Sequence, residues 1–152
     1  GLFDENHFAY LEDIDIGYRA KIFGYQNMYC PTALVYHVGS GTSGSKYNSF
    51  KVRLSARNNI YLNYKNMPFL QMAVNFLPLL GGYLLKYAFF VKIGFGKDYK
   101  DGILEGLRTR KEQRKVPFRM RRLPNYIRIE GELIRHMFAY AKDWIIRKTT
   151  GK

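Results

Sequence analysis

The sequence has a single cysteine, and it lacks any recognisable leader segment. Cys30 is the only cysteine among 152 residues, so an internal disulfide or a cysteine-based zinc centre is excluded. A lone thiol is typical of proteins that work in a reducing compartment. The chain begins at Gly1 without an initiator methionine, a basic n-region or an apolar signal segment. We therefore expect it to start inside a longer protein.

Disorder is excluded by the residues that are present. Hydrophobic residues make up 47% of the chain and aromatic residues 16%. This is enough apolar surface to offset the entropy lost when the backbone is ordered. The length is that of one domain, or of a small domain with an appendage.

Acidic residues are scarce and unevenly placed. The chain has 25 Lys and Arg against 12 Asp and Glu, a formal net charge of +13. Residues 1–45 nevertheless contain five acidic and two basic residues, so their net charge is −3 and the remainder carries +16. This asymmetry predicts an acidic segment that carries catalytic or binding chemistry, joined to a basic segment that meets phosphate in nucleic acid or lipid headgroups. A merely soluble basic surface is the alternative.

One long run has no charge at all. Residues 67–85 contain no charged side chain, and the apolar character continues to residue 95. The run approaches the length of a membrane span, but Pro78 and the pair Gly81 and Gly82 interrupt a straight helix. The pattern favours a broken helical hairpin that lies in the membrane interface. A basic run at residues 108–122 follows, and such a cluster beside an apolar segment predicts contact with anionic lipid.

Residue spacing predicts the local structure of the N-terminal segment. Ile14, Tyr18 and Ile22 recur at helical spacing and Gly24 follows them, which indicates a helix over about 13–23. Glu12 then lies at the start of this helix beside Asp13. At that position the free N–H groups and the helix dipole favour ionised carboxylates.

The segments after this helix, and the C-terminal tail, have patterns of their own. Residues 25–30 and 33–38 are predicted to be short strands, and the second ends near His37, just before a Gly-Ser loop. Asp15 and Arg19 are spaced to form an ion pair on the helix surface. In the tail, apolar residues at three-to-four spacing predict an amphipathic helix over residues 125–147.

Two motifs in residues 1–45 resemble inverting family 2 glycosyltransferases of the GT-A fold, especially bacterial rhamnosyltransferase-like enzymes. The first is the box Tyr-x-Glu-Asp-x-Asp-x-x-x-Arg, which runs from Tyr10 to Arg19. The second is a histidine followed by a Gly-Ser loop. Its members are His37, Gly39, Ser40 and Gly41. The later residues, with RNNIYLNYKNMP and the basic run, are also similar to the C-terminal extension of that family.

The resemblance implies an α/β fragment. Residues 1–45 would be the C-terminal part of the glycosyltransferase catalytic domain, and residues 46–152 a mainly α-helical, membrane-associated extension. The family's nucleotide-binding half, with its Asp-x-Asp metal motif, would precede residue 1. We therefore expect the 152-residue chain alone to be inactive.

The resemblance also implies roles for individual residues. Asp13 would be the general base, assisted by Glu12, and His37 would complete the coordination of Mg²⁺ or Mn²⁺. The Gly39-Ser40-Gly41 loop would close over the diphosphate of the nucleotide-sugar donor. The acceptor would be a saccharide or lipid-linked saccharide of a cell-surface polysaccharide or glycolipid. The enzyme would work as a peripheral or monotopic protein on the cytoplasmic face of the bacterial inner membrane.

Each of these roles has an alternative. Adjacent acids at a helix start commonly serve only as capping groups, and a lone histidine at a strand end is commonly structural. The chain as a whole could instead be a basic nucleic-acid-binding module or a non-catalytic membrane adaptor. The basic residues match no nucleic-acid-binding signature, so nucleic acid is not an expected partner.

Overall fold

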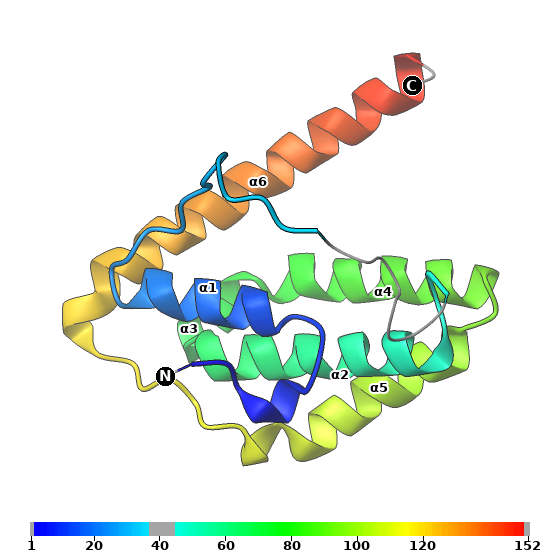
Figure 1. The fold of residues 1–152 in the computed structure, drawn as a ribbon, viewed down its shortest axis with the longest axis horizontal. Coiled ribbons are helices and arrows are strands. Elements are labelled where there is room, and N and C mark those ends of the chain that lie inside the picture. Colours follow the sequence, from blue (N-terminus) through cyan, green and yellow to red (C-terminus); the bar gives the residue numbers. More distant parts are fainter. Residues whose placement is uncertain (1, 37–44, 151–152) are drawn as a thin grey trace.

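The computed structural model describes residues 2–36 and 45–150, and every regular element in these residues is a helix. The elements in order are η1 (Glu5–His7), α1 (Glu12–Ile22), α2 (Ser49–Asn66), α3 (Phe69–Val74), α4 (Phe76–Lys92), α5 (Gly96–Thr109), η2 (Arg110–Glu112), η3 (Met120–Arg122) and α6 (Leu123–Thr150). Figure 1 shows α2 beside α5, with α1 packed on α2 and α6 extending away to the C-terminus.

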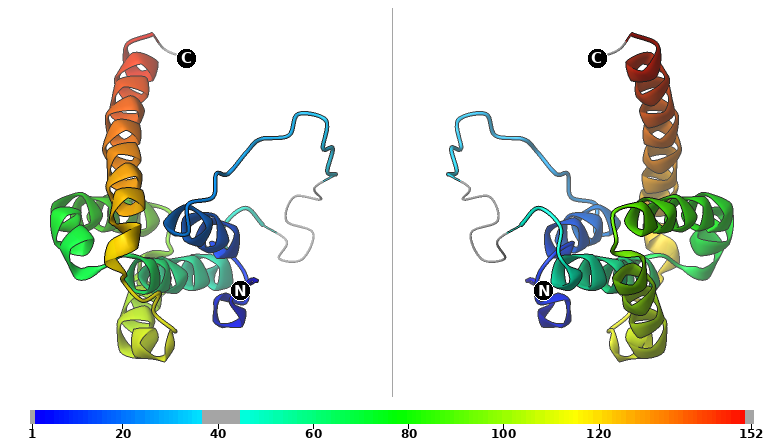
Figure 2. Two further views of the ribbon diagram at one scale, coloured as in Figure 1. Left: turned by 90° about the vertical axis from the view of Figure 1, so that its left-hand side faces the viewer. Right: turned by 90° about the vertical axis from the view of Figure 1, so that its right-hand side faces the viewer.

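The α/β prediction is wrong for the part of the chain that the structure describes. No strand occurs in residues 2–36 and 45–150, and residues 25–36, which include most of the two predicted strands, have no regular structure. A strand is stable only when a neighbour pairs with its backbone N–H and C=O groups, and the described residues offer none. Figure 2 shows this segment leading away from the helices. Its side chains are exposed; Tyr29 and Tyr36 are both 88% accessible.

The first predicted helix is confirmed. α1 spans Glu12–Ile22, within one residue of the predicted start and end. Gly24 follows it with φ = +92°, the left-handed conformation that commonly ends a helix and favours glycine. The predicted ion pair between Asp15 and Arg19 is also present, at 2.9 Å, but Asp15 is buried and not on the helix surface as expected.

α2 has clear start and stop signals. The side chain of Asn48 accepts a hydrogen bond from the backbone N–H of Lys51 at 2.8 Å, which caps the helix N-terminus. The helix ends before Met67, whose backbone is extended because Pro68 follows it.

Two glycines let α5 approach α2 closely. A β-carbon at Gly102 would lie 2.2 Å from the carbonyl oxygen of Arg53, and one at Gly106 would lie 2.8 Å from Cβ of Ile60. Both distances are too short for real atoms. The backbones of α2 and α5 are therefore in contact at a spacing that a larger residue would prevent.

The apolar stretch forms two helices, as predicted, but they separate at a different residue. The break lies at Asn75, between α3 and α4. Pro78 lies in the first turn of α4, where no helical hydrogen bond requires its missing N–H. Gly81 and Gly82 remain helical. Among the described residues, no helix is long and apolar enough to cross a membrane.

Two small apolar clusters hold the helices together. One joins α1 to the start of α6 through Ile22, Tyr126 and Ile129. The other joins α2 to α5 through Val52, Ala56 and Tyr99, with α4 packed against it. The amphipathic helix predicted at 125–147 is confirmed as the longer α6, although its residues 134–149 are all exposed.

Candidate functional site

The acid pair of the motif follows a turn with unusual backbone geometry. Phe8, Tyr10 and Leu11 have φ values of 58°, 69° and 68°, in the left-handed region that side-chain-bearing residues rarely adopt. Each such residue costs about 1–2 kcal/mol. Conformations of this kind persist only where the surrounding structure fixes them, and they concentrate at functional sites.

Helix α2 supplies the groups that fix this turn. Asn58 is fully buried, and its amide nitrogen lies within hydrogen-bond distance of three backbone oxygens. The acceptors are the carbonyl oxygens of His7 (2.7 Å), Ala9 (2.8 Å) and Tyr10 (2.9 Å). The neighbouring Arg57 donates to the carbonyl oxygen of Asn6 at 3.1 Å. One turn of α2 thus specifies the backbone path that leads to the acid pair.

A buried ionic network ties α1 to the same helix. Asp15 is fully buried in α1 and accepts hydrogen bonds from Lys65 at 2.8 Å and Asn66 at 2.7 Å, both on α2. Arg19 binds the same carboxylate at 2.9 Å. Lys65 also reaches Asp4 at 2.5 Å, at the start of the turn. The two ends of the turn are therefore joined through one ammonium group.

The network keeps its carboxylates ionised. Burial by itself would raise the pKa of Asp15, but the hydrogen bonds from Lys65 and Asn66 and the charges of Lys65 and Arg19 outweigh it and lower that pKa. Burial acts in the same upward direction on Asp4, and Lys65 again reverses it, so the pKa of Asp4 is also lowered. Burial lowers the pKa of His7, which favours the neutral imidazole inside the turn.

Asp13 and Glu12 face a cavity rather than this network. Asp13 is exposed in the first turn of α1, where its Oδ1 accepts a hydrogen bond from the backbone N–H of Ile14 at 2.8 Å. Glu12 is half-buried beside it. The cavity has a volume of about 540 Å³. Its lining residues are Phe3, Asp4, Glu5, Phe8, Glu12 and Asp13. Two exposed aromatic rings and three further carboxylates thus surround the predicted base.

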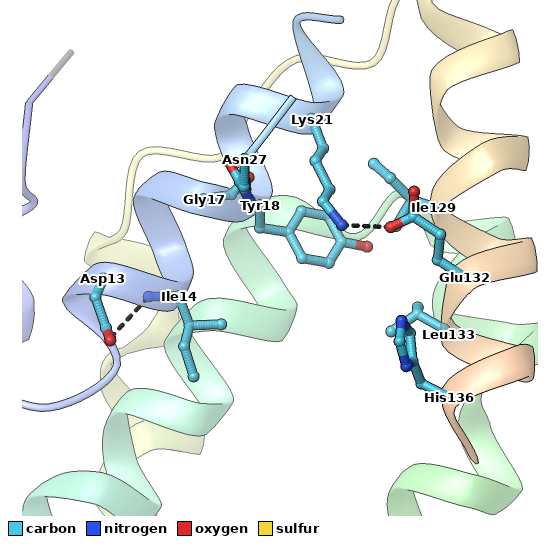
Figure 3. Close-up of a pocket in the computed structure, with 10 residues that line it drawn as sticks. All are labelled: Asp13, Ile14, Gly17, Tyr18, Lys21, Asn27, Ile129, Glu132, Leu133 and His136. Atoms are coloured by element: carbon cyan, nitrogen blue, oxygen red, sulfur yellow. Dashed lines mark hydrogen bonds and ion pairs between the residues drawn. The ribbon is translucent and has the colours of Figure 1, made fainter. Parts of the chain in front are cut away.

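Asp13 also borders a second cavity, between α1 and α6. This groove has a volume of about 310 Å³ and combines an apolar floor, which includes Ile129, with a polar rim. Figure 3 shows Lys21 of α1 reaching across to Glu132 of α6, with which it forms an ion pair. His136 lies further along α6 on the same side. The carboxylate of Asp13 is therefore accessible from two directions.

The other predicted site residues lie outside the described part of the chain. His37, Gly39, Ser40 and Gly41 all fall within residues 37–44, so their predicted roles at the metal and the diphosphate stay predictions. In residues 2–36 and 45–150, no group of three or more His, Cys, Asp or Glu side chains is arranged to hold a metal ion.

The residues of α2 that hold the turn were not predicted from the sequence. These residues share one face of the helix, because Lys65 and Asn66 follow Asn58 by seven and eight residues. Leu62 lies on the same face and is buried with them. Polar residues that recur on a helix face with buried apolar ones indicate a buried network, although this pattern does not say which distant atoms they bind.

Comparison with known proteins gives no family for this chain. No protein-family model matches it, and neither curated proteins nor solved structures give a match.

Proposed function

We propose that this chain forms the acceptor side of a glycosyltransferase site, with Asp13 as the general base. The observation that carries the proposal is the placement of Asp13. It is an exposed carboxylate at a helix N-terminus, at the edge of a cavity and directly after a strained turn that buried side chains fix in place. A group that served only to cap α1 would not require this preceding geometry.

The cavity has the chemistry that a sugar requires. Carboxylates accept hydrogen bonds from hydroxyl groups, and those around Asp13 would bind the hydroxyls that flank the reacting one. Phe3 and Phe8 are 61% and 77% exposed at the cavity wall, and their rings offer flat apolar surfaces on which the C–H face of a pyranose can pack. The volume of about 540 Å³ is within the range of small-ligand sites.

The proposed step is an inverting displacement. The oxygen of an acceptor hydroxyl attacks the anomeric carbon of a nucleotide sugar, a new C–O bond forms, and the bond to the diphosphate breaks. Asp13 takes the proton of the attacking hydroxyl, and the nucleoside diphosphate leaves with the electron pair. Glu12 orients the acceptor hydroxyls. The rigid turn holds both carboxylates in place before substrate arrives, which reduces the entropic cost of alignment.

The donor side of the site follows from the family resemblance alone. A nucleotide-binding half N-terminal to this chain would bind the donor, and a divalent cation held there would stabilise the charge of the leaving diphosphate. The cytoplasmic face of a bacterial inner membrane stays the predicted location.

The test is Asp13→Asn in the complete enzyme, which contains both halves. We expect kcat to fall by about 10²–10⁴, because the attacking hydroxyl loses its proton acceptor, while donor binding changes little. Asp143→Asn is the matched control, since Asp143 is an exposed aspartate in the distal half of α6. Radiolabelled sugar transfer gives kcat, and calorimetric titration with the donor gives its affinity. A near-normal kcat for Asp13→Asn would remove Asp13 from this role.

The nucleic-acid-binding alternative receives no specific support from the basic run. Several of its residues contact the chain itself: the guanidinium of Arg122 lies 3.8 Å from the ring centre of Phe23, and the ammonium of Lys115 lies 5.0 Å from that of Tyr64. Tighter binding to oligonucleotides than to anionic vesicles, with a steep salt dependence, would favour this alternative.

A further inference from the structure

The helix pair α3–α4 directs its uncharged polar residues inward. On α3, Gln71 accepts a hydrogen bond from the hydroxyl of Tyr18 at 2.9 Å and donates one to Glu130 of α6 at 3.0 Å. Asn75, between the two helices, also donates to Glu130, at 2.8 Å. These polar groups attach the pair to α1 and α6.

The same arrangement continues on α4. The hydroxyl of Tyr83 donates to Asn59 at 2.7 Å and accepts from Asn63 at 2.9 Å, and both partners are on α2. Phe90 stacks on Tyr99 of α5 with ring centres 5.1 Å apart. The inner side of α4 is therefore held by hydrogen bonds to α2 and by ring contacts with α5.

The outer side of α4 is apolar and uncovered. α4 has no buried residue. Leu77, Leu84, Leu85 and Val91 recur at intervals of seven, eight and fourteen residues, which places them on one face, opposite Tyr83. Leu77 and Leu85 are 74% and 75% exposed. A β-carbon at Gly81 or Gly82 would have no neighbouring atom within 4 Å, so none of the described residues covers this side.

Two residues of α3, in the same apolar run of the sequence, are also exposed. They are Phe69 and Leu70, which are 83% and 71% exposed. We call the resulting surface the outer apolar face; it consists of Phe69, Leu70, Leu77, Leu84, Leu85 and Val91. A surface helix of a soluble protein normally has the opposite pattern, with its apolar stripe toward the core and its polar residues in water. The inverted pattern indicates an apolar environment outside.

We propose that the outer apolar face lies in the interface of a bilayer that contains anionic lipid. The side chains would enter the boundary between headgroups and acyl chains, with α3 and α4 parallel to the membrane plane. Exposed Lys92 lies on α4 itself, next to Val91, and would reach the headgroups. The formal charge of +13 on the whole chain complements a negative lipid surface.

This occupant explains more of the face than a protein partner does. The six side chains of the outer apolar face are all hydrocarbon, so none of them can give a protein interface its specific hydrogen bonds. Such a face is typical of helices that lie in a membrane interface. The proposal concerns binding to lipid alone and does not rest on the glycosyltransferase assignment.

The first experiment is vesicle flotation of the 152-residue chain. Vesicles of phosphatidylcholine with 30% phosphatidylglycerol are compared with vesicles of phosphatidylcholine alone, at low and high salt. We expect partitioning to be stronger on the anionic vesicles and to weaken with salt without disappearing, since the apolar contribution is not screened.

Two double variants test the face itself. Leu77→Ser with Leu85→Ser should lower the partition coefficient about tenfold or more for each leucine, because each loses its burial in the interface. Leu2→Ser with Leu34→Ser is the matched control, since Leu2 and Leu34 are 83% and 77% exposed elsewhere. The control should partition as the unchanged chain does. Equal losses in both variants would overturn the proposal.

A dye attached at one position reports which part of the chain enters the lipid, whatever the overall affinity for vesicles. With Cys30→Ser as background, Leu85→Cys and Leu34→Cys each carry one environment-sensitive dye. We expect a blue shift on vesicle addition at position 85 and none at 34. The alternative occupant of the outer apolar face is a second copy of this chain, and analytical ultracentrifugation without lipid measures whether a dimer forms. A stable dimer that protects position 85, with no shift on vesicles, would show a second copy on this face and overturn the membrane assignment.

Discussion

The turn before α1 and the helix pair α3–α4 differ in what they bury. The turn is surrounded by buried polar groups, whereas the helix pair exposes apolar ones. Around the turn, charged and amide groups are buried: Asp15, Asn58 and Asn66 are at most 2% exposed, and Lys65 is 5% exposed. On α4, leucines are exposed while the polar Tyr83 points inward. Both regions contradict the simple rule that apolar residues lie inside and polar residues outside.

The two reversals have different costs and indicate different functions. Burying charge is unfavourable unless every partner is present, so the network around Asp15 indicates that a defined backbone path is required there. Exposing leucine costs no internal contact, so the outer apolar face adds little to the folding of the chain. The turn before α1 therefore has a fixed geometry, whereas the outer apolar face is suited to contact with a partner outside the chain. Single substitutions can test whether this division is real.

The largest effect is expected at Lys65. Lys65→Met removes the ammonium that joins Asp4 to Asp15 and leaves a buried carboxylate with fewer partners, so the free energy of unfolding should fall by about 3–5 kcal/mol. Lys97→Met is the matched control, because Lys97 is 90% exposed in its pair with Asp101. The control should leave the free energy of unfolding almost unchanged, because solvent screens an exposed ion pair. Urea unfolding followed by circular dichroism measures both. Equal losses of stability would show that the buried contacts of Lys65 contribute no more than the exposed pair of Lys97 with Asp101.

A smaller effect is expected at Asn58. Asn58→Ala leaves the carbonyl oxygens of the turn without their donor, and the free energy of unfolding should fall by about 1–3 kcal/mol. Hydrogen exchange at the amides of residues 8–11 should accelerate more than elsewhere, since the strained backbone is released. Asn27→Ala, which removes an exposed hydrogen bond of 3.2 Å to Gly17, is the control and should leave that exchange unchanged. Unaltered hydrogen exchange in Asn58→Ala would mean that the turn keeps its conformation without the hydrogen bonds of Asn58.

The smallest effect is expected on α4. Leu85→Ala should alter the free energy of unfolding by less than about 0.5 kcal/mol, because the side chain is 75% exposed and leaves no cavity. Leu62→Ala, at a residue only 8% exposed on α2, should cost about 2–5 kcal/mol. Thermal unfolding in detergent-free buffer compares the pair. A cost at Leu85 similar to that at Leu62 would place Leu85 in a core and remove the contrast between the regions.

The parts of the fold that depend on local sequence were predictable. The spacing of Ile14, Tyr18 and Ile22, together with Gly24, located α1 to within a residue, because these signals act within a few residues. The tail helix was found in the same way. The break between α3 and α4 was misplaced at Pro78 because a proline in a first helical turn is tolerated, and its position in the turn depends on where the helix starts.

The parts that depend on distant residues were not predictable. The two expected strands failed because a β-pattern becomes a strand only with a partner, and the described residues contain none. Asp13 and Glu12 were singled out from their motif, but the fixation of their turn was missed. Asn58 and His7 are 51 residues apart, and no local pattern pairs their atoms.

The glycine contact between α2 and α5 has a mechanical consequence. Because a backbone oxygen of α2 would lie only 2.2 Å from a β-carbon at Gly102, the two helices meet at hard contact and cannot slide closer. A movement of α5 toward α2 would therefore have to move α2 as well. Tyr83 connects α4 to α2, and α2 carries the turn that ends at Asp13. We therefore expect α2 and α5 to move together as one rigid unit, which also carries Asn58 and the turn that it holds.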